Sequence, residues 1–245
     1  MELDWLTARP VAHRGLHGNG IIENSLSAAA AAIAANYAIE VDLQLSSDGE
    51  VVVFHDDTLE RLTAEHGGVS TRTAAQLKAI KLKDSNDTIP SLGELLELVA
   101  GKAPLVLELK SSWNGNTTLA RKVADRLASY DGHVAVMSFD PDLVVALRKH
   151  APNLPRGIVA ERWYLHPHWN FLTRARKHYL GLLLHLFRTK PHFVAYAQFD
   201  LPAVAPRITR RIFDMPLLTW TVRIERERER VSPWIDQIIF EHIRP

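Results

Sequence analysis

Cysteine is absent from this sequence of 245 residues, which excludes disulfide bonds and thiolate metal sites. Long hydrophobic runs are absent as well. The longest candidate, Leu180 to Phe187, is interrupted by Gly181 and His185 and is far shorter than the roughly 20 residues that span a bilayer. Residues 1–10 carry three charged side chains and lack the apolar run of a signal peptide. We therefore expect a cytoplasmic protein without a transmembrane segment.

An excess of charge of one sign is also missing. The chain has 29 basic and 28 acidic residues and a net charge of +1, so no overall basic surface predicts nucleic-acid binding. Hydrophobic residues make up 47% of the chain, which is enough for one large core. Because α/β barrels of this length fold as single domains, we expect one domain over residues 1–245.

The sequence does contain a regular alternation of short apolar runs and longer helical patterns. The apolar runs predict strands at Pro10–His13, Ile39–Leu45, Leu105–Leu109, Val134–Phe139, Gly157–Ala160, Phe193–Tyr196, Leu217–Val222 and Gln237–Phe240. Helical segments between them include Ser25–Ala35, Ser91–Ala100, Thr117–Ser129, Pro141–His150 and Arg223–Arg230. Eight strands that alternate with helices predict a closed (β/α)8 barrel, the TIM-barrel fold. The alternative is an open doubly wound sheet, but the turn after the first strand is not a glycine fingerprint that leads into a helix.

One additional predicted strand, Val51–His55, interrupts this alternation. Five residues separate it from the preceding strand, which is too few for a parallel crossover. Because Asp-Gly in this link is a hairpin signal, we expect an antiparallel hairpin that places His55 about opposite Asp42. Residues 56–90 show little periodicity, and we expect them to form a short excursion over the barrel mouth.

Acidic residues gather on neighbouring predicted strands. Glu40 and Asp42 are two residues apart, so their side chains share a face, and Glu108 lies near the end of the next barrel strand. Carboxylates this close repel one another unless a cation lies between them. The oxygen-only set predicts a site for Mg²⁺ or Ca²⁺ rather than zinc. The alternative is a salt-bridge network in which Arg14 or Lys110 neutralises the acids.

Two histidines accompany these acids. His13 ends the first predicted strand, where barrel enzymes place catalytic groups, and the hairpin brings His55 to the same mouth. Imidazoles donate and accept protons near pH 7. Arg14 follows His13 and can bind phosphate oxygens with two hydrogen bonds. Two histidines, three carboxylates and an arginine together predict cleavage of a phosphate ester.

Short motifs also occur in a distinctive order along the chain, from residue 13 to about residue 222. They are His-Arg-Gly, Glu-Asn-Ser, Glu-x-Asp, Ser-Ser-Asp-Gly, His-Asp, Ile-Pro-Ser-Leu, Leu-Glu-Leu-Lys, Ser-Phe-Asp and Trp-Thr-Val. This ordered set resembles the glycerophosphodiester phosphodiesterase family. That family is a (β/α)8 barrel related to phosphoinositide-specific phospholipase C. It hydrolyses glycerophosphodiesters to glycerol 3-phosphate and an alcohol with a divalent cation. The resemblance implies the same fold, activity and small-molecule substrate here.

The resemblance also implies roles for individual residues by their position in these motifs. Two residues would be the acid/base pair, three would bind Mg²⁺ or Ca²⁺, and three would contact the substrate or balance charge in the site. In that order, they are His13 and His55; Glu40, Asp42 and Glu108; and Arg14 at the phosphate, Lys110 as a charge partner and Trp220 at the substrate.

Some positions depart from the motifs of the family. Glu23 and Asn24 correspond to its Pro-Glu-Asn-Thr turn, where Asn24 would support the first loop and Glu23 would lie near the metal. Arg223 follows Trp-Thr-Val where the family usually has Asn, and Glu241 stands where the family has Asp. We expect Arg223 and Glu241 to edge the substrate side and to influence the preference for the alcohol or the glycerol, with no part in the core chemistry.

The segment at residues 162–190 is unusually basic. It contains six lysine and arginine residues, no acidic residue, four histidines and six aromatic residues. Leu180, Leu183, Leu184 and Phe187 fall at helical spacing. Such a basic helix can lie on an anionic membrane surface. Alternatively, it is an ordinary barrel helix whose apolar stripe packs on the sheet.

Three alternatives to a soluble-diester hydrolase follow from these features. A related enzyme would cleave lysophospholipid or phospholipid headgroups at the inner face of a membrane, with residues 162–190 as the contact. A barrel of this kind can also be a catalytically silent binding protein, although the predicted catalytic and metal-binding residues are all present. Nucleic-acid binding would need a basic surface that the net charge does not suggest. The sequence predicts no particular oligomeric state.

Overall fold

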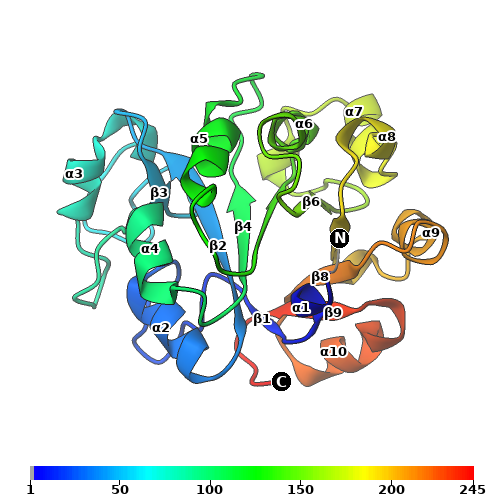
Figure 1. The fold of residues 1–245 in the computed structure, drawn as a ribbon, viewed down its shortest axis with the longest axis horizontal. Helices are drawn as coiled ribbons and strands as arrows, with labels where there is room; N and C mark the ends of the chain where they lie inside the picture. The colour runs from blue at the N-terminus through cyan, green and yellow to red at the C-terminus, as the bar shows by residue number, and fades with distance from the viewer. Residues whose placement is uncertain (1–2) are drawn as a thin grey trace.

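The computed structural model describes residues 3–245, and its strands form a closed barrel (Figure 1). Neighbouring strands follow the order β1-β9-β8-β7-β6-β5-β4-β2-β3, and β1 also pairs with β2, which closes the ring. Every pairing within the ring is parallel, and only β3 joins its neighbour antiparallel. The strands are β1 Val11–Ala12, β2 Ala38–Leu45, β3 Val51–Val53, β4 Leu105–Leu109, β5 Val134–Ser138, β6 Arg156–Ala160, β7 Phe193–Ala197, β8 Leu217–Val222 and β9 Gln237–Phe240.

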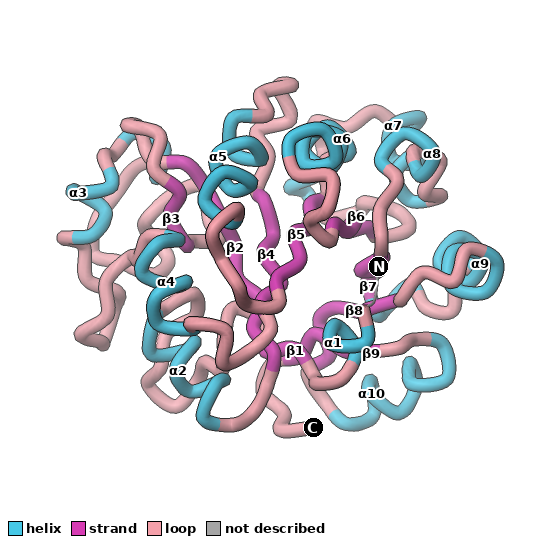
Figure 2. Tube along the Cα trace, viewed as in Figure 1, coloured by secondary structure: helices cyan, strands magenta, loops and turns pink. Residues whose placement is uncertain are grey.

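Helices surround this ring of strands (Figure 2). They bury their apolar stripes against the outer face of the barrel, where Val41 and Leu43 of β2 also point. The α-helices are α1 Asp4–Thr7, α2 Leu26–Ala34, α3 Ala74–Lys78, α4 Leu92–Val99, α5 Thr118–Leu127, α6 Pro141–His150, α7 Arg174–Gly181, α8 Leu186–Thr189, α9 Val204–Ile212 and α10 Glu225–Val231. Single 3-10 turns cover Val69–Thr71, Pro167–Trp169, Gln198–Asp200 and Ser232–Trp234.

The predicted (β/α)8 barrel is confirmed, and the open doubly wound sheet is wrong. All eight predicted barrel strands are present, with ends within one or two residues of the predicted ones. Local signals explain several helix boundaries. Ser25 and Ser91 cap the helices that follow them through side-chain hydrogen bonds to Ala28 N and Glu94 N. Asp140 caps α6, whose first residue is a proline.

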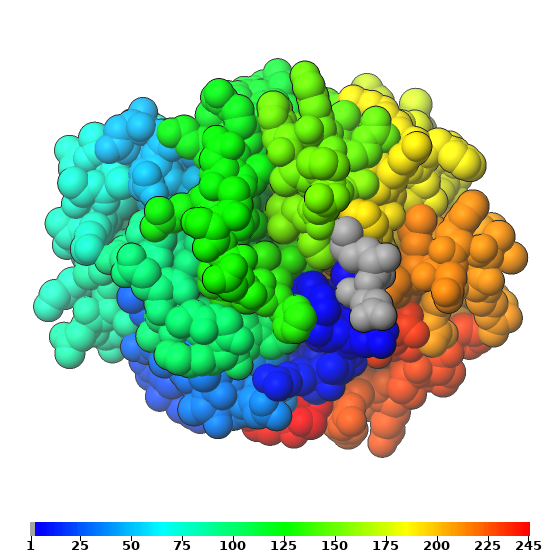
Figure 3. All heavy atoms as spheres, viewed as in Figure 1, coloured from blue at the N-terminus to red at the C-terminus, as the bar shows by residue number. Residues whose placement is uncertain are grey.

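The interior of the barrel changes from apolar to polar along the strands. At the end where the strands begin, a cluster that includes Val11, Ala38, Val106 and Ile239 fills the interior. Helix α1 packs on the same cluster, and the blue atoms of the segment that includes it lie near the centre of this face in Figure 3. Because side chains two residues apart on a strand share a face, the positions two residues further on also point into the barrel, but nearer its open end. This alternation places the polar site residues at the carboxyl ends of the strands.

Strand β3 forms the predicted hairpin with β2, but its register differs slightly from the prediction. Phe54, not His55, lies beside Asp42 and donates its N–H to the Asp42 carbonyl at 3.0 Å. The reason is that Ser46 pairs with Glu50, which centres the turn on residue 48. Gly49 takes the left-handed conformation in this turn, with φ of 79°. His55 therefore follows the end of the strand rather than lying within it.

Residues 56–90 continue from this hairpin as a mostly irregular segment. They pack a small apolar cluster of their own against β3, formed by Val52, Phe54, Leu59, Val69, Leu77, Ile80, Leu82 and Ile89. Residues of this segment reach the rim of the barrel, since Asp57 and Thr58 line a cavity there. A single domain over the whole chain stays a prediction.

The segment at 162–190 is not the continuous amphipathic helix that the apolar spacing indicated. It divides into a 3-10 turn, α7 and α8, and Leu183 has a left-handed backbone with φ of 57° between the two helices. Leu180 and Leu183 are buried, whereas Leu184 and Phe187 are 60% and 84% exposed. The break separates residues that a single helix would have placed on one face.

Within residues 3–245, no helix combines the length and the apolar composition that crossing a membrane requires. The cytoplasmic location stays a prediction.

Candidate active site

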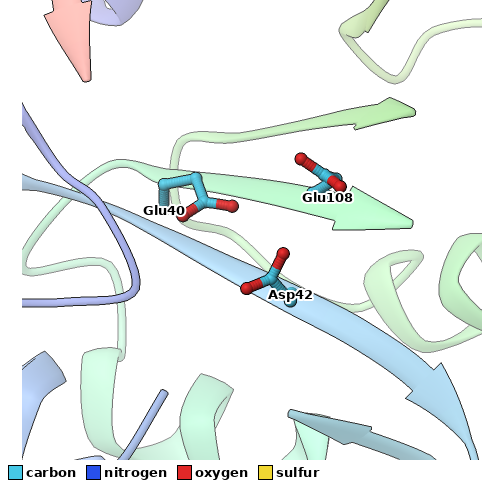
Figure 4. Close-up of side chains that lie close together, drawn as sticks. All are labelled: Glu40, Asp42 and Glu108. Atoms are coloured by element: carbon cyan, nitrogen blue, oxygen red, sulfur yellow. The ribbon is translucent and has the colours of Figure 1, made fainter. Parts of the chain in front are cut away.

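Three buried carboxylates lie together at the open end of the barrel (Figure 4). Glu40 and Asp42 project from β2, and Glu108 projects from β4, where it pairs in register with Asp42. Each offers an oxygen, and these atoms lie within 4.8 Å of one another. The exposed fraction is 1% for Glu40 and Asp42 and 7% for Glu108. The sequence-predicted acidic set is therefore one compact group of oxygen donors.

Cationic side chains neutralise part of this group. The Lys110 ammonium lies 2.8 Å from both Asp42 Oδ1 and Glu108 Oε1. Arg14 Nε lies 3.3 Å from Asp42 Oδ2. The expected alternative, a salt-bridge network, is thus partly present. It does not satisfy all of Glu40, because the buried Glu40 Oε1 has no hydrogen-bond partner among residues 3–245.

The electrostatics of Glu40 favour an added cation. Burial, followed by the charges of Asp42 and Glu108, raises the pKa of Glu40 well above its ordinary value. An unpartnered oxygen on a buried acid, beside two further carboxylates, fits a hard divalent cation that prefers oxygen ligands. The buried acidic triad can therefore bind such an ion.

The loop after β1 holds Arg14 against these acids. Arg14 has φ of 54°, and its backbone N–H donates to Glu40 Oε2 at 2.9 Å. Its guanidinium donates to Glu23 Oε1 at 2.6 Å. Asn24 donates its side-chain amide to Asp42 Oδ2 at 2.9 Å and accepts the Asp42 N–H. Asn24 thus fixes an acid of the triad, whereas Glu23 pairs with arginines and is not one of the three clustered carboxylates.

His13 is oriented by a residue from the other end of the chain. Its Nδ1 lies 2.5 Å from Glu241 Oε1, and its Nε2 lies 3.8 Å from Glu40 Oε2. Burial lowers the pKa of His13, although the hydrogen bond to Glu241 acts in the opposite direction. Arg223 binds the second oxygen of Glu241 at 2.7 Å. Glu241 therefore contacts a predicted site residue rather than only edging the substrate side, because barrel closure places β9 beside β1.

His55 is oriented by its neighbour in the chain. Its Nδ1 lies 2.7 Å from Asp56 Oδ1. Arg61 binds both Asp56 and Glu23, and Glu23 in turn binds Arg14. A chain of ion pairs therefore links Asp56, which contacts His55, to Arg14 in the loop after β1.

One cavity of about 150 Å³ joins these groups. All eight site residues predicted from the sequence line it, namely His13, Arg14, Glu40, Asp42, His55, Glu108, Lys110 and Trp220. The remaining lining residues include Met137, Phe139, Val159 and Arg223. Trp220 stands against Phe139, with ring centroids 5.4 Å apart, and its indole N–H donates to the Ala195 carbonyl. The structure thus brings together every residue of the predicted site.

The contacts that three further residues make in this region were not predicted from the sequence. Glu241 and Asp56 orient the two histidines, and Phe139 forms part of the wall. Glu241 and Phe139 stand two residues after the interior residues Ile239 and Met137. This two-residue alternation was the signal in the sequence that could have found them.

A barrel with a buried acidic triad, two oriented histidines and basic side chains at its carboxyl end has the features of a hydrolase of phosphate esters. The model of the glycerophosphoryl diester phosphodiesterase family matches residues 13–242. The chain belongs to this family and is a phosphoric diester hydrolase. Membership favours an enzyme over a silent binding protein.

Relatives of known sequence agree with this assignment. A glycerophosphodiester phosphodiesterase of Caldanaerobacter subterraneus is 30% identical over 174 residues, which cover 67% of this chain and 71% of that protein. A glycerophosphodiester phosphodiesterase of Bacillus altitudinis is 31% identical over 159 residues, or 60% of this chain and 64% of that protein.

Solved structures share the fold. A phosphodiesterase of Oleispira antarctica, in complex with the product sn-glycerol 3-phosphate, superposes with a TM-score of 0.77 at 22% identity and covers 96% of this chain and 94% of its own. A glycerophosphodiester phosphodiesterase of Thermotoga maritima superposes with a TM-score of 0.72 at 23% identity, with 95% and 94% covered.

Proposed function

We propose that this protein hydrolyses glycerophosphodiesters to sn-glycerol 3-phosphate and an alcohol, within one catalytic domain over residues 1–245. The observation that carries the proposal is the buried triad of carboxylates between His13 and His55 in one cavity. Family membership supports the reaction class. The product named with the Oleispira antarctica structure supports glycerol 3-phosphate as the common product.

Glu40, Asp42 and Glu108 would hold one divalent cation, Mg²⁺ or Ca²⁺. When bound, such an ion supplies Lewis-acid polarisation of phosphate and hydroxyl oxygens. The unpartnered Oε1 of Glu40 is the donor that most clearly supports this assignment. Lys110 lies between Asp42 and Glu108, and its flexible side chain can turn its ammonium to the substrate.

Arg14 and Lys110 would bind the phosphate of the diester. Both cations line the cavity beside the acids, and the Arg14 guanidinium is held in place by Glu23. A guanidinium matches two phosphate oxygens at once, whereas an ammonium acts as a point charge. Trp220 would form the wall against which the substrate rests.

His13 would accept the proton of the attacking hydroxyl, and His55 would protonate the leaving alkoxide. The lowered pKa of His13 favours its neutral form at pH 7, and donation of Nδ1–H to Glu241 leaves Nε2 free to accept a proton. Asp56 holds His55 Nδ1 and leaves its Nε2 free to face the substrate. The attacking hydroxyl is that of the substrate or of water.

Replacement of either histidine tests this function. General acid–base catalysis contributes about 10²–10⁴-fold, so His13→Ala and His55→Ala should each lower kcat by that factor. Glycerol 3-phosphate release from glycerophosphocholine and glycerophosphoglycerol is the measurement. His150→Ala, on the exposed end of α6, is the matched control. Near-normal turnover in both histidine variants, with melting curves that show folded protein, would refute the assignment.

A second candidate substrate is a lipid diester at a membrane surface. It is favoured by exposed apolar side chains in the basic segment at 162–190. Those more than 45% exposed are Trp163, Leu165, Phe171, Leu182, Leu184 and Phe187. Basic side chains among exposed apolar ones are typical of peripheral contact with anionic lipid. This contact would bring the site to lysophospholipids or phospholipids at the inner face of a membrane.

A further inference from the structure

A second cavity, of about 660 Å³, adjoins the one that contains the acidic triad. The two share five lining residues, His55, Glu108, Lys110, Phe139 and Trp220, so they are continuous. A diester whose phosphate lies at Arg14 and Lys110 can therefore extend one of its alcohols into the second cavity. The side chains that line the second cavity would therefore determine which alcohol the enzyme prefers in its substrate.

Aromatic rings form much of the wall of this second cavity. They are Trp113, Phe139, Trp169, Phe199 and Trp220. The rings pack on one another: the Trp169 centroid lies 5.0 Å from that of Phe139 and 5.9 Å from that of Trp113. Phe199 is 62% exposed and stands at the rim. Such a wall attracts either an apolar group or a cation over the ring faces.

Glu161 distinguishes between these two kinds of ligand. It follows β6 directly, two residues after the interior residue Val159, and it lines the same cavity. Its exposed fraction is 7%. No lysine, arginine or histidine nitrogen lies within 4.0 Å of its carboxylate in the described part of the chain, residues 3–245. The cation that faces it, Lys177, donates its ammonium to the Tyr164 carbonyl at 2.7 Å instead.

Burial, followed by the charge of Asp200, raises the pKa of Glu161 to about 7. Lys177 and a hydrogen bond from Trp169 act in the opposite direction but do not restore the ordinary value. A buried carboxylate of this kind lacks a counter-charge, and an entering cation would supply one.

We infer that this cavity binds the positively charged alcohol of a zwitterionic glycerophosphodiester, with a quaternary ammonium between the aromatic rings and Glu161. The inference rests on the proposed function, since it names the substrate class of the same site. The charges of the two cavities match such a substrate. Basic Arg14 and Lys110 border the first cavity, where the phosphate would lie, and acidic Glu161 and Asp57 border the second.

Two other alcohols fit this cavity less well. An acyl chain would enclose the Glu161 carboxylate in apolar surroundings and bring it no counter-charge, which costs free energy. A primary ammonium brings three N–H donors, which the ring faces do not match, so it would depend on the carboxylates and hydroxyls of the lining rather than on its aromatic wall. Methylated ammonium groups need no such acceptors, and ring faces together with one carboxylate are sufficient for them.

The decisive experiment compares two diesters in two variants. Glu161→Gln removes the charge, and Phe199→Ala removes an exposed ring that can be truncated without harm to the core. Each should lower kcat/KM for glycerophosphocholine about tenfold more than kcat/KM for glycerophosphoglycerol. The reason is that contact with ring faces or a carboxylate increases the affinity for a desolvated cation by roughly that factor. Glu229→Gln, on the exposed face of α10, is the matched control and should leave the ratio unchanged.

Calorimetric titration with choline alone gives a readout that does not depend on turnover. Choline should bind the wild-type protein and bind Glu161→Gln about tenfold more weakly. Equal losses for both diesters, equal choline affinities, or a preference for lysophosphatidylcholine that follows acyl-chain length would overturn the inference. If the wild-type protein hydrolyses neither diester, the proposed function fails, and the choline titration still decides whether this site exists.

Discussion

At the scale of single residues, the most consequential contact is the one between His13 and Glu241. These residues are 228 positions apart, yet the imidazole Nδ1 lies 2.5 Å from the carboxylate. A carboxylate on one ring nitrogen fixes the tautomer and the orientation of the other nitrogen. Glu241 is therefore a positioning residue for the histidine that we propose as the base.

Glu241→Gln should lower kcat about 10–100-fold with little change in KM, because partners that orient a reactive group typically contribute that factor. Steady-state release of glycerol 3-phosphate measures both constants. Glu229→Gln, exposed on α10, is again the control. A variant with wild-type kcat would show that His13 is oriented without Glu241.

The lowered pKa of Glu241 leads us to expect that the stability of the fold depends on pH. Burial alone would raise the pKa of Glu241, but the hydrogen bonds and charges of its partners, chiefly His13, hold it far below the ordinary 4.5. A folded-state pKa below the unfolded one adds stability that is present above about pH 4.5 and is lost as the pH falls. The melting temperature of the wild-type protein should therefore fall more than that of Glu241→Gln between about pH 6 and about pH 3.5. Parallel curves would contradict this.

Residues that share one strand could be paired from the sequence, whereas contacts that only barrel closure creates could not. Glu40 and Asp42 could be paired because a strand alternates its side chains. Alternation along β9 could have placed Glu241 inside the barrel, but its pairing with His13 could not be predicted, because the last strand meets the first only when the barrel closes. Glu161 was missed because one acid at the end of a strand is unremarkable until its aromatic surroundings are known.

At the scale of elements, the β2–β3 hairpin decides where His55 lies. The antiparallel pairing followed from the short link, since a parallel crossover needs a dozen or more residues. The register could not be fixed to a single residue, because Asp-Gly fits more than one turn length. The division of residues 162–190 into short helices could not be predicted either, because helical spacing does not show where a residue such as Leu183 adopts a left-handed backbone conformation.

Gly49 is a position in this hairpin where substitution should cost stability. Its φ of 79° is costly for any residue with a Cβ, and the added Cβ would meet only the flexible end of Lys122 at 3.5 Å. Gly49→Ala should therefore lower the free energy of unfolding by about 1–2 kcal/mol through backbone strain alone. Chemical denaturation measures this difference.

Gly68→Ala is the control, because Gly68 has an ordinary φ of −77° and room for a Cβ. It should change the free energy of unfolding by no more than about 0.5 kcal/mol. Equal losses in the two variants would contradict the role that we assign to the left-handed turn.

At the scale of the whole molecule, a nearly neutral chain carries a strongly uneven distribution of charge. The net charge is +1, whereas residues 162–190 contain six basic residues and no acid. Exposed Leu165 and Phe187, at 80% and 84%, lie in the same segment. This combination of charge and apolar surface supports the proposed membrane contact.

Co-sedimentation with vesicles of anionic phospholipid tests this contact. The wild-type protein should bind at low ionic strength and dissociate at about 0.5 M salt, because screening weakens attraction between exposed charges. Phe187→Asp should weaken binding about tenfold through the loss of apolar burial. Ile224→Asp, 54% exposed but outside the segment, is the matched control. Absence of binding by the wild-type protein at low salt would remove the membrane-surface proposal and leave soluble diesters.

Three buried carboxylates and two histidines would make this barrel a cation-dependent diesterase. The most direct measurement is release of glycerol 3-phosphate from glycerophosphocholine and glycerophosphoethanolamine with Mg²⁺, with Ca²⁺ and with EDTA. Release in the presence of one of these ions, its loss in EDTA and its return on re-addition are the predicted results. Undiminished release in EDTA, or no release with either ion from folded protein, would contradict the claim.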